Sequence, residues 1–138
     1  LAAGLALLSA SSADAESSDT HDRPDMNPSE RIVYRALRKP TADRQRFQSD
    51  KEKGRGPNAA QIADPRLYTG MSAFAPRRFA AEQAHYLHLG GYLAELHVPD
   101  EVQMDQTVRP GHYTVQGDAD SRLAMVRAVH DVHSVLKG

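Results

Sequence analysis

The sequence has no cysteine among its 138 residues, and this absence excludes several kinds of site. The chain can form no disulfide, offers no thiolate nucleophile and cannot build a cysteine-based metal site. An excess of one charge is also missing, because 17 lysines and arginines nearly balance 18 aspartates and glutamates. The balance gives no basic footprint for nucleic acid and no net charge that would favour a membrane surface. We therefore expect neither kind of partner.

The sequence also lacks a hydrophobic run long enough to suggest a membrane span in the mature protein. The apolar run at residues 1–8 is too short to cross a bilayer as a helix. It precedes a small-x-small pattern at Ala13 and Ala15, which is typical of a signal-peptide cleavage site. We predict that residues 1–15 are the remnant of a secretory signal and that the protein is secreted or periplasmic. The alternative is an alanine- and leucine-rich helix or linker that joins the domain to a preceding segment.

The rest of the chain divides into a polar segment and one domain. Residues 16–30 are polar, contain two prolines and carry almost no apolar side chains, which predicts a disordered linker. Residues 31–138 suffice for a single small domain with one core. The hydrophobic content of 40% and the charged content of 25% are ordinary for a globular protein.

The pattern within residues 31–138 predicts an α+β domain. Strands are predicted at 31–38, 67–74, 92–98 and 112–117. A helix is predicted at 77–89, between Pro76 and the stop at Gly90 and Gly91. Residues 41–63 predict a short helix that carries Phe47 and then a loop, and residues 121–138 favour a helix, although AVHDVHSVL also fits a strand. The order of these elements indicates α+β rather than a regular parallel repeat.

Arg35 stands out in the first predicted strand. Alternation places it on the same face as Val33 and Leu37. A buried arginine is costly without an anion or a carboxylate partner. The alternative is a strand edge at which the side chain reaches the water.

Two predicted strands each carry a polar face. Glu95 and His97 share one face of the strand at 92–98, and His112, Thr114 and Gln116 share one face of the strand at 112–117. If the two strands are neighbours, these side chains converge, and a carboxylate beside imidazoles can act as a general base. The alternative is a solvated outer face of an antiparallel sheet.

A metal site is a further alternative for the histidines. Glu95, His97 and His112 offer suitable ligand atoms, and so do His130 and His133. The sequence has no HExxH motif, however, so we expect no metal.

The sequence gives only weak indications of phosphate binding and of a nucleophilic serine. The basic segment KEKGRGPN at residues 51–58 can hold a phosphate, but it lacks the P-loop pattern and is better explained as a solvated loop. Ser72 lies in TGMSAF rather than in G-x-S-x-G, so a nucleophilic serine is not predicted. Gly70, just before it, indicates a bulge or a close approach by a ligand or another backbone.

The order of the motifs VYRAL, LYTGMSAF, RRFAAEQA and GYLAELHVP resembles the ADP-ribosyltransferase superfamily of NAD-using toxins and related NAD glycohydrolases. The resemblance covers about residues 31–117. It implies an α+β fold of small split β-sheets with flanking helices, with NAD bound in the cleft as the substrate. Position by position, Arg35 matches the arginine that contacts NAD phosphate or ribose, and Ser72 matches the serine that shapes the nicotinamide pocket. Phe74 would then stack on the nicotinamide ring. Three further residues complete the expected NAD contacts: Tyr34, His112 and Gln116.

The catalytic carboxylate is the point at which the sequence departs from the family. The family usually has a glutamate near the start of a late strand, but the strand GHYTVQG has none. The reaction needs a carboxylate to hold the ribose hydroxyl, and Glu95 is the only one placed within a predicted strand, so we expect Glu95 to be catalytic. The resemblance thus implies a secreted domain that transfers ADP-ribose, with a possible protein target, or hydrolyses the bond to nicotinamide. The alternative is a non-enzymatic secreted or periplasmic α+β binding domain.

Overall fold

The computed structural model describes residues 31–138, so the predicted signal remnant at 1–15 and the predicted linker at 16–30 lie outside the described residues. Six described strands are present: β2 (Ile32–Leu37), β3 (Met71–Phe74), β4 (Tyr92–His97), β5 (Met104–Gln106), β6 (His112–Val115) and β7 (Val126–Asp131). The helices are η2 (Arg44–Phe47), α1 (Ala59–Ala63), α2 (Arg66–Thr69), α3 (Arg77–Tyr86), α4 (Ala119–Ala124) and α5 (Val132–Lys137). The predicted α+β class is confirmed.

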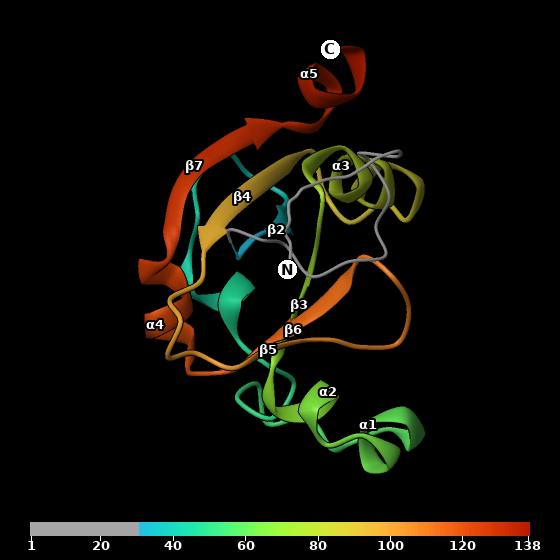
Figure 1. Ribbon diagram of the computed structural model, residues 1–138, viewed down its shortest axis with the longest axis vertical. Helices are drawn as coiled ribbons and strands as arrows, with labels where there is room; N and C mark the ends of the chain where they lie inside the picture. Colours follow the sequence, from blue (N-terminus) through green and yellow to red (C-terminus); the bar gives the residue numbers. More distant parts are fainter. Residues whose placement is uncertain (1–30) are drawn as a thin grey trace, which may run out of the picture.

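The strands form one antiparallel sheet in the order β5-β6-β3-β2-β4-β7. Figure 1 shows β4 and β7 side by side at one end and β3, β5 and β6 together at the other. β2 and β4 pair along all six residues of each strand, and β3 and β6 pair along all four. Between β2 and β3, in contrast, the register of the described residues consists of the one pair Tyr34–Phe74. The sheet therefore has two three-stranded halves, β5-β6-β3 and β2-β4-β7, which are joined at one position.

Each face of the sheet carries its own hydrophobic cluster. The larger cluster contains Val33 and Leu37 from β2 and is covered by Phe47 of η2. The burial of a side chain such as Phe47 stabilises the fold by about 1.5–3 kcal/mol. On the opposite face, three alanines of α3 (Ala80, Ala81, Ala84) and Val132 of α5 pack on the sheet. The strand alternation predicted from the sequence assigns β2, β4 and β6 residues to these faces correctly.

The segment 67–74 is only half a strand, so that prediction is wrong in its first half. Pro65 has helical φ and ψ (−59° and −19°) and precedes the short helix α2, which ends at Thr69 with Gly70 as its C-cap. Gly70 is required there for space, because a Cβ atom would lie 2.3 Å from Cγ2 of Thr114 and 3.0 Å from the carbonyl oxygen of Arg66. The close approach predicted at Gly70 is thus made by the protein itself.

The C-terminal segment 121–138 is not one helix. α4 ends at Ala124, β7 pairs with β4, and α5 starts after Asp131, whose side chain accepts hydrogen bonds from the backbone of His133 and Ser134. The strand alternative for AVHDVHSVL is correct up to Asp131. The free edge of β4 offers backbone partners, and this tertiary pairing overrides the helical spacing of the valines.

Arg122 of α4 fastens the β5-β6-β3 half to the loop that follows η2. Its fully buried guanidinium donates to the carbonyls of Phe47 and Val115 at 2.7 and 3.1 Å and to the carboxylate of Glu52 at 2.6 Å. Burial raises the pKa of Glu52, but hydrogen bonds from Ser49 and Arg122 outweigh it and hold that pKa at about 2. The loop that borders the candidate site is therefore anchored to the buried guanidinium of Arg122 by an ion pair with the partly exposed Glu52.

Candidate functional site

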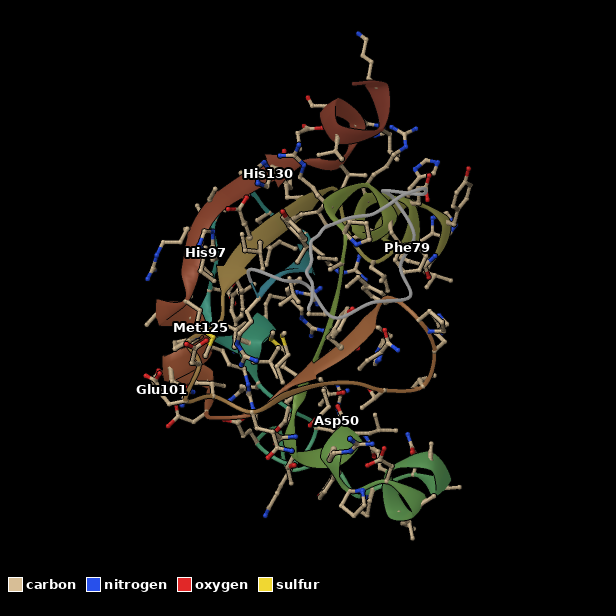
Figure 2. The ribbon with its side chains drawn as sticks, in the orientation of Figure 1. Asp50, Phe79, His97, Glu101, Met125 and His130 are labelled. Atoms are coloured by element: carbon tan, nitrogen blue, oxygen red, sulfur yellow. The ribbon has the colours of Figure 1, made fainter. Side chains whose placement is uncertain are left out.

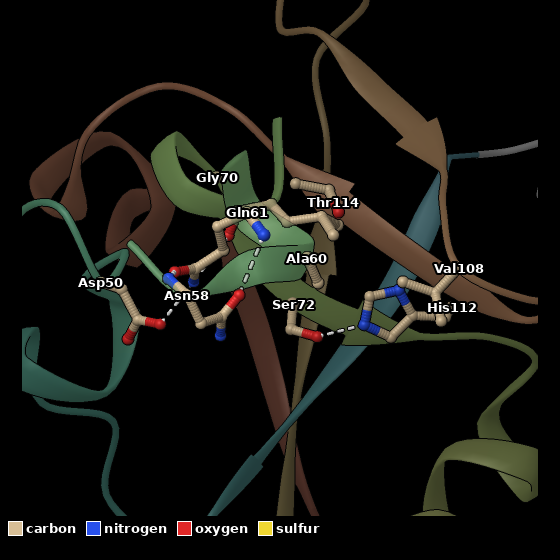
Figure 3. A pocket seen from close by; sticks show the side chains of 10 residues that line it. Asp50, Asn58, Ala60, Gln61, Gly70, Ser72, Val108, His112 and Thr114 are labelled. Atoms are coloured by element: carbon tan, nitrogen blue, oxygen red, sulfur yellow. Dashed lines mark hydrogen bonds between the residues drawn. The ribbon is translucent and has the colours of Figure 1, made fainter. Parts of the chain in front are cut away.

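A pocket of about 260 Å³ opens beside β3 and β6 (Figure 3). Ser72 of β3 and His112 and Thr114 of β6 form one wall, because directly paired residues of antiparallel strands point to the same face. Asp50 and Asn58, from the loop before α1, line the other side. The β5–β6 loop adds Val108, which has a φ of +66°, an unusual conformation for a β-branched residue.

Ser72 and His112 form a hydrogen-bonded pair in this pocket. The Ser72 hydroxyl contacts Nε2 of His112 (Figure 3). The other ring nitrogen, Nδ1, lies 3.1 Å from the carbonyl oxygen of Thr107. Since a carbonyl can only accept, Nδ1 carries the proton, and Nε2 of the neutral ring accepts from Ser72. The network therefore selects one tautomer of His112.

The surroundings of His112 keep the ring neutral and fixed. Burial lowers the pKa of His112 from 6.5, and the nearby charges of Arg109 and Arg35 lower it further, while the bond to Thr107 partly opposes the shift. The ring meets Phe74 edge-on at 5.3 Å between centroids. A neutral, oriented imidazole beside a hydroxyl is suited to act as a base.

A second polar cluster lies on the other half of the sheet, along β4 and β7 (Figure 2). The carboxylate of Glu95 accepts hydrogen bonds from Nε2 of His97 at 2.6 Å and from Nε2 of His130 at 2.7 Å. The bond from His97 lowers the pKa of Glu95, partial burial opposes this, and His130 lowers it further. Both oxygens of the expected catalytic carboxylate are therefore already occupied by imidazoles.

The two polar strand faces do not converge, because their strands are not neighbours in the sheet, which was the condition for a shared site. β3 and β2 lie between β6 and β4. The pairing places His112, Phe74, Tyr34 and Glu95 in one row across one face of the sheet. The row spans three strand spacings, or roughly 14 Å from His112 to Glu95. The order of the strands was not deducible from alternation, which is a local property of each strand.

Within the described residues, Arg35 has neither the carboxylate partner nor the strand-edge position considered from the sequence. It lies on the central strand β2, on the face opposite to Ser72 and Glu95. Its guanidinium donates to the carbonyl oxygens of Arg46 and Ser72, both at 3.0 Å. Burial, together with the charges of Arg46 and Arg122, lowers the pKa of Arg35 to about 10.

The guanidinium of Arg35 occupies the gap where the halves of the sheet separate. Continued pairing of β2 with β3 would bring Ala36 opposite Ser72, but the ladder stops at Tyr34–Phe74. The carbonyl of Ser72 then accepts from Arg35, and that of Ala36 accepts from Arg46 at 2.7 Å. Two arginines thus satisfy the backbone groups that the separating strands leave unpaired.

A wider hollow of about 500 Å³ adjoins Arg46. It is lined by Gln45, Arg46, Gln48, Glu52, Lys53 and Arg55. Burial lowers the pKa of Lys53, and the charges of Arg35 and Arg55 add to this effect. Glu52 is bound to Arg122, so the free charge around the hollow is positive. The basic segment 51–58 therefore borders an anion-attracting surface.

The remaining residues expected to contact NAD have partners within the protein. Phe74 packs edge-on against Phe79 and His112, and the guanidinium of Arg109 lies 5.8 Å from its ring centroid. Tyr34 approaches the ring of His130 at 6.0 Å between centroids. Gln116 accepts from the hydroxyl of Thr69 at 2.9 Å and donates to the carbonyl of Arg66, which ties β6 to α2.

Several residues in or beside the pocket were not identified from the sequence. Asp50 directly precedes the segment 51–58, which was explained as a solvated loop, and Asn58 ends it. Thr107 supports His112 from the loop before β6. The spacing of Asn58 and Gln61 was a usable signal, because it is the capping box that starts α1. No local pattern marks Thr107, whose role depends on the turn that brings it to His112.

Among residues 31–138, no group of three or more His, Asp or Glu side chains is arranged to hold a metal ion. In the same part of the chain, no helix has the length and apolar composition needed to cross a bilayer. Comparisons with known families, curated proteins and solved structures find no match to this chain. The functional argument therefore depends on the geometry of the site.

Proposed function

We propose that the domain binds NAD where the two halves of the sheet separate and that it transfers ADP-ribose or hydrolyses the bond to nicotinamide. The resemblance described above implies a cleft between two small sheets, and the single Tyr34–Phe74 connection supports such an arrangement. The observation that carries the proposal is a group of cations at this separation: Arg35, Arg46, Lys53 and Arg55.

The cations are suited to a pyrophosphate because their charges are only partly compensated. Among the described residues, neither Arg35 nor Arg46 forms an ion pair with a carboxylate. Arg46 also has a buried Nε without a hydrogen-bond partner. Each of the lowered pKa values of Arg35, Arg46 and Lys53 is due first to burial and then to neighbouring cations. An anion in the adjoining hollow would relieve this repulsion and form charge-assisted hydrogen bonds.

The nicotinamide end of NAD would enter the Ser72–His112 pocket. Asp50 links this pocket to the hollow beside Arg46. It lines the pocket and forms an ion pair at 3.3 Å with Arg55, which lines the hollow. Cleavage of the glycosidic bond builds positive charge on the ribose, and a group that accepts from a ribose hydroxyl stabilises that charge. Glu95 remains our candidate for this role. The nucleotide would extend from the pocket along the same face of the sheet, and a ribose hydroxyl would replace His97 or His130 at the Glu95 carboxylate.

The first experiment measures NAD binding by calorimetry and nicotinamide release by chromatography. We expect the double variant Arg46→Gln/Lys53→Gln to weaken NAD binding at least about tenfold, since two cations that face the hollow are lost. The matched control is Arg127→Gln/Lys137→Gln, which removes the same charge from exposed positions elsewhere. Equal affinity in both double variants, or no NAD binding by the unaltered domain, would refute the proposal.

The second experiment compares NAD turnover by the unaltered domain and by Glu95→Gln. A loss of about 100-fold is expected if Glu95 holds the ribose in the transition state. Equal turnover would remove Glu95 from the mechanism. Binding without any turnover would instead favour the non-enzymatic binding domain.

A further inference from the structure

The Ser72–His112 pair has the parts of a nucleophile and its base, although the sequence around Ser72 gave no such indication. The Ser72 hydroxyl is hydrogen-bonded to Nε2 of His112, and the Thr107 carbonyl accepts a hydrogen bond from Nδ1 of the same ring at 3.1 Å. A nucleophile whose base is oriented by a third group is the general arrangement of covalent catalysis by serine. Here a backbone carbonyl takes the place of the usual carboxylate.

The pair is rigid on one side and accessible on the other. His112 is 9% exposed, and Phe74 and Thr107 hold its ring. The hydroxyl of Thr107 is itself held by Thr114 at 2.7 Å. Ser72, in contrast, is only half-buried and lines the pocket of about 260 Å³. A substrate in the pocket would therefore meet the hydroxyl, with Nε2 of His112 beside it at the pocket wall.

The pocket walls indicate the class of substrate. Ala60, Leu67 and Val108 provide apolar surface, and the volume suits a short acyl group. Asp50 lies at the same pocket and disfavours an anionic substrate. The side-chain oxygen of Asn58 accepts from the backbone of Gln61 at 2.9 Å, which fixes the amide and leaves its NH₂ group to a ligand (Figure 3).

We infer that Ser72 and His112 hydrolyse small, uncharged esters in this pocket, with the Asn58 amide as a donor to the developing oxyanion. Ser72 Oγ bonds to the ester carbonyl carbon while its proton passes to Nε2 of His112. The bond from that carbon to the alcohol oxygen then breaks, and His112 gives the proton to the leaving oxygen. Water adds to the acyl carbon, its proton passes to Nε2, and the acid leaves as Oγ regains the proton. This activity is separate from the proposed NAD chemistry and needs only water as co-reactant.

The test is the hydrolysis of 4-nitrophenyl acetate by the whole chain. Ser72→Ala and His112→Gln should each lower kcat about 100-fold or more. The matched controls Ser134→Ala and His88→Gln alter exposed residues of the same types and should keep the full rate. Mass spectrometry of the acetylated protein should place the acyl group on Ser72, in the peptide 67–77. The rate should rise with pH through a midpoint below 6.5, as His112 loses its proton.

A further variant separates catalysis from folding. Asn58→Asp keeps the oxygen that caps α1 but removes the amide donor, so it should fold normally and lower kcat about 100-fold. The inference is overturned if Ser72→Ala keeps the rate of the unaltered chain, if the acyl group is found on Tyr68 or Thr69 instead of Ser72, or if Asn58→Asp has no effect. Because the substrate contains no nucleotide, each result is independent of NAD turnover.

Discussion

The two halves of the sheet each place histidine beside an oxygen partner, on the same face, but with different consequences. In the β5-β6-β3 half, His112 faces a hydroxyl and a carbonyl, is buried and borders an open pocket. In the β2-β4-β7 half, His97 and His130 both bind the carboxylate of Glu95. A carbonyl fixes the tautomer and leaves a basic nitrogen available, whereas the carboxylate occupies the imidazole nitrogens that face it. The partner, rather than the residue type, decides which histidine can do chemistry.

The halves also differ in the way that their arginines are used. The pocket half is tied together by Arg122, whose guanidinium is fully buried against Glu52 and several carbonyls. In the other half, Arg127 of β7 is exposed and donates to the carbonyls of Ala124 and Val126. Removal of Arg122 would leave several buried carbonyls without a donor, which is far more costly than loss of a surface contact.

The largest expected effect is that of Arg122→Met. We expect a loss of about 3–5 kcal/mol in the free energy of unfolding, because the carbonyls that Arg122 binds lose their donor. Urea denaturation followed by circular dichroism measures the change. Arg127→Met, the matched control in the other half, should change stability by less than about 0.5 kcal/mol. Similar effects of the two substitutions would contradict the difference between the halves.

A smaller effect is expected from a methyl group added at Gly70. The new Cβ would lie 2.3 Å from Cγ2 of Thr114, so Gly70→Ala should cost about 1–3 kcal/mol through overpacking at the pocket wall. Gly91→Ala is the control before β4, where a Cβ meets no atom within 4 Å, and should have little effect. Thr114→Ser removes Cγ2, so the double variant should recover part of the lost stability. No recovery would show that the strain lies elsewhere.

The smallest stability effect is expected from Glu95→Gln, and it should depend on pH. The lowered pKa of Glu95 means that the folded state favours its ionised form. Its contribution is therefore present above its unfolded pKa, near 4.5, and is lost as the pH falls through the lower folded value. We expect Glu95→Gln to cost about 1–2 kcal/mol at pH 7 and much less at pH 3.

Urea unfolding at the two pH values tests this difference. The titration of His112, followed by NMR, should be unchanged in Glu95→Gln, because roughly 14 Å of sheet lies between the two residues. A shift in the pKa of His112 would mean that Glu95 and His112 interact electrostatically, and it would contradict the independence of the two halves.

Sequence patterns predicted more of the fold than of the site. β2, the core of α3, β4 and β6 lie close to their predicted positions, because apolar periodicity is a local signal. The helix α3 ends at Tyr86, however, before the predicted stop at Gly90 and Gly91. The strand predicted at 67–74 is wrong before Gly70, where the chain forms α2. The helix predicted at 121–138 is interrupted where β7 pairs with the edge of β4. For the site, Ser72 and His112 were both named from the sequence, yet their contact was not, since it depends on the pairing of β3 with β6.

What the sequence determined by itself is the absence of cysteine chemistry, the balance of charge and the face on which each strand residue lies. Those properties follow from composition and from the two-residue period of a strand. Only the tertiary structure decided that Ser72 meets His112, that Glu95 lies two strands farther away, and that backbone carbonyls hold Arg35. The physical reason is that strand order and the gap between β2 and β3 result from pairings between residues far apart in the chain. No local pattern of side chains specifies such pairings.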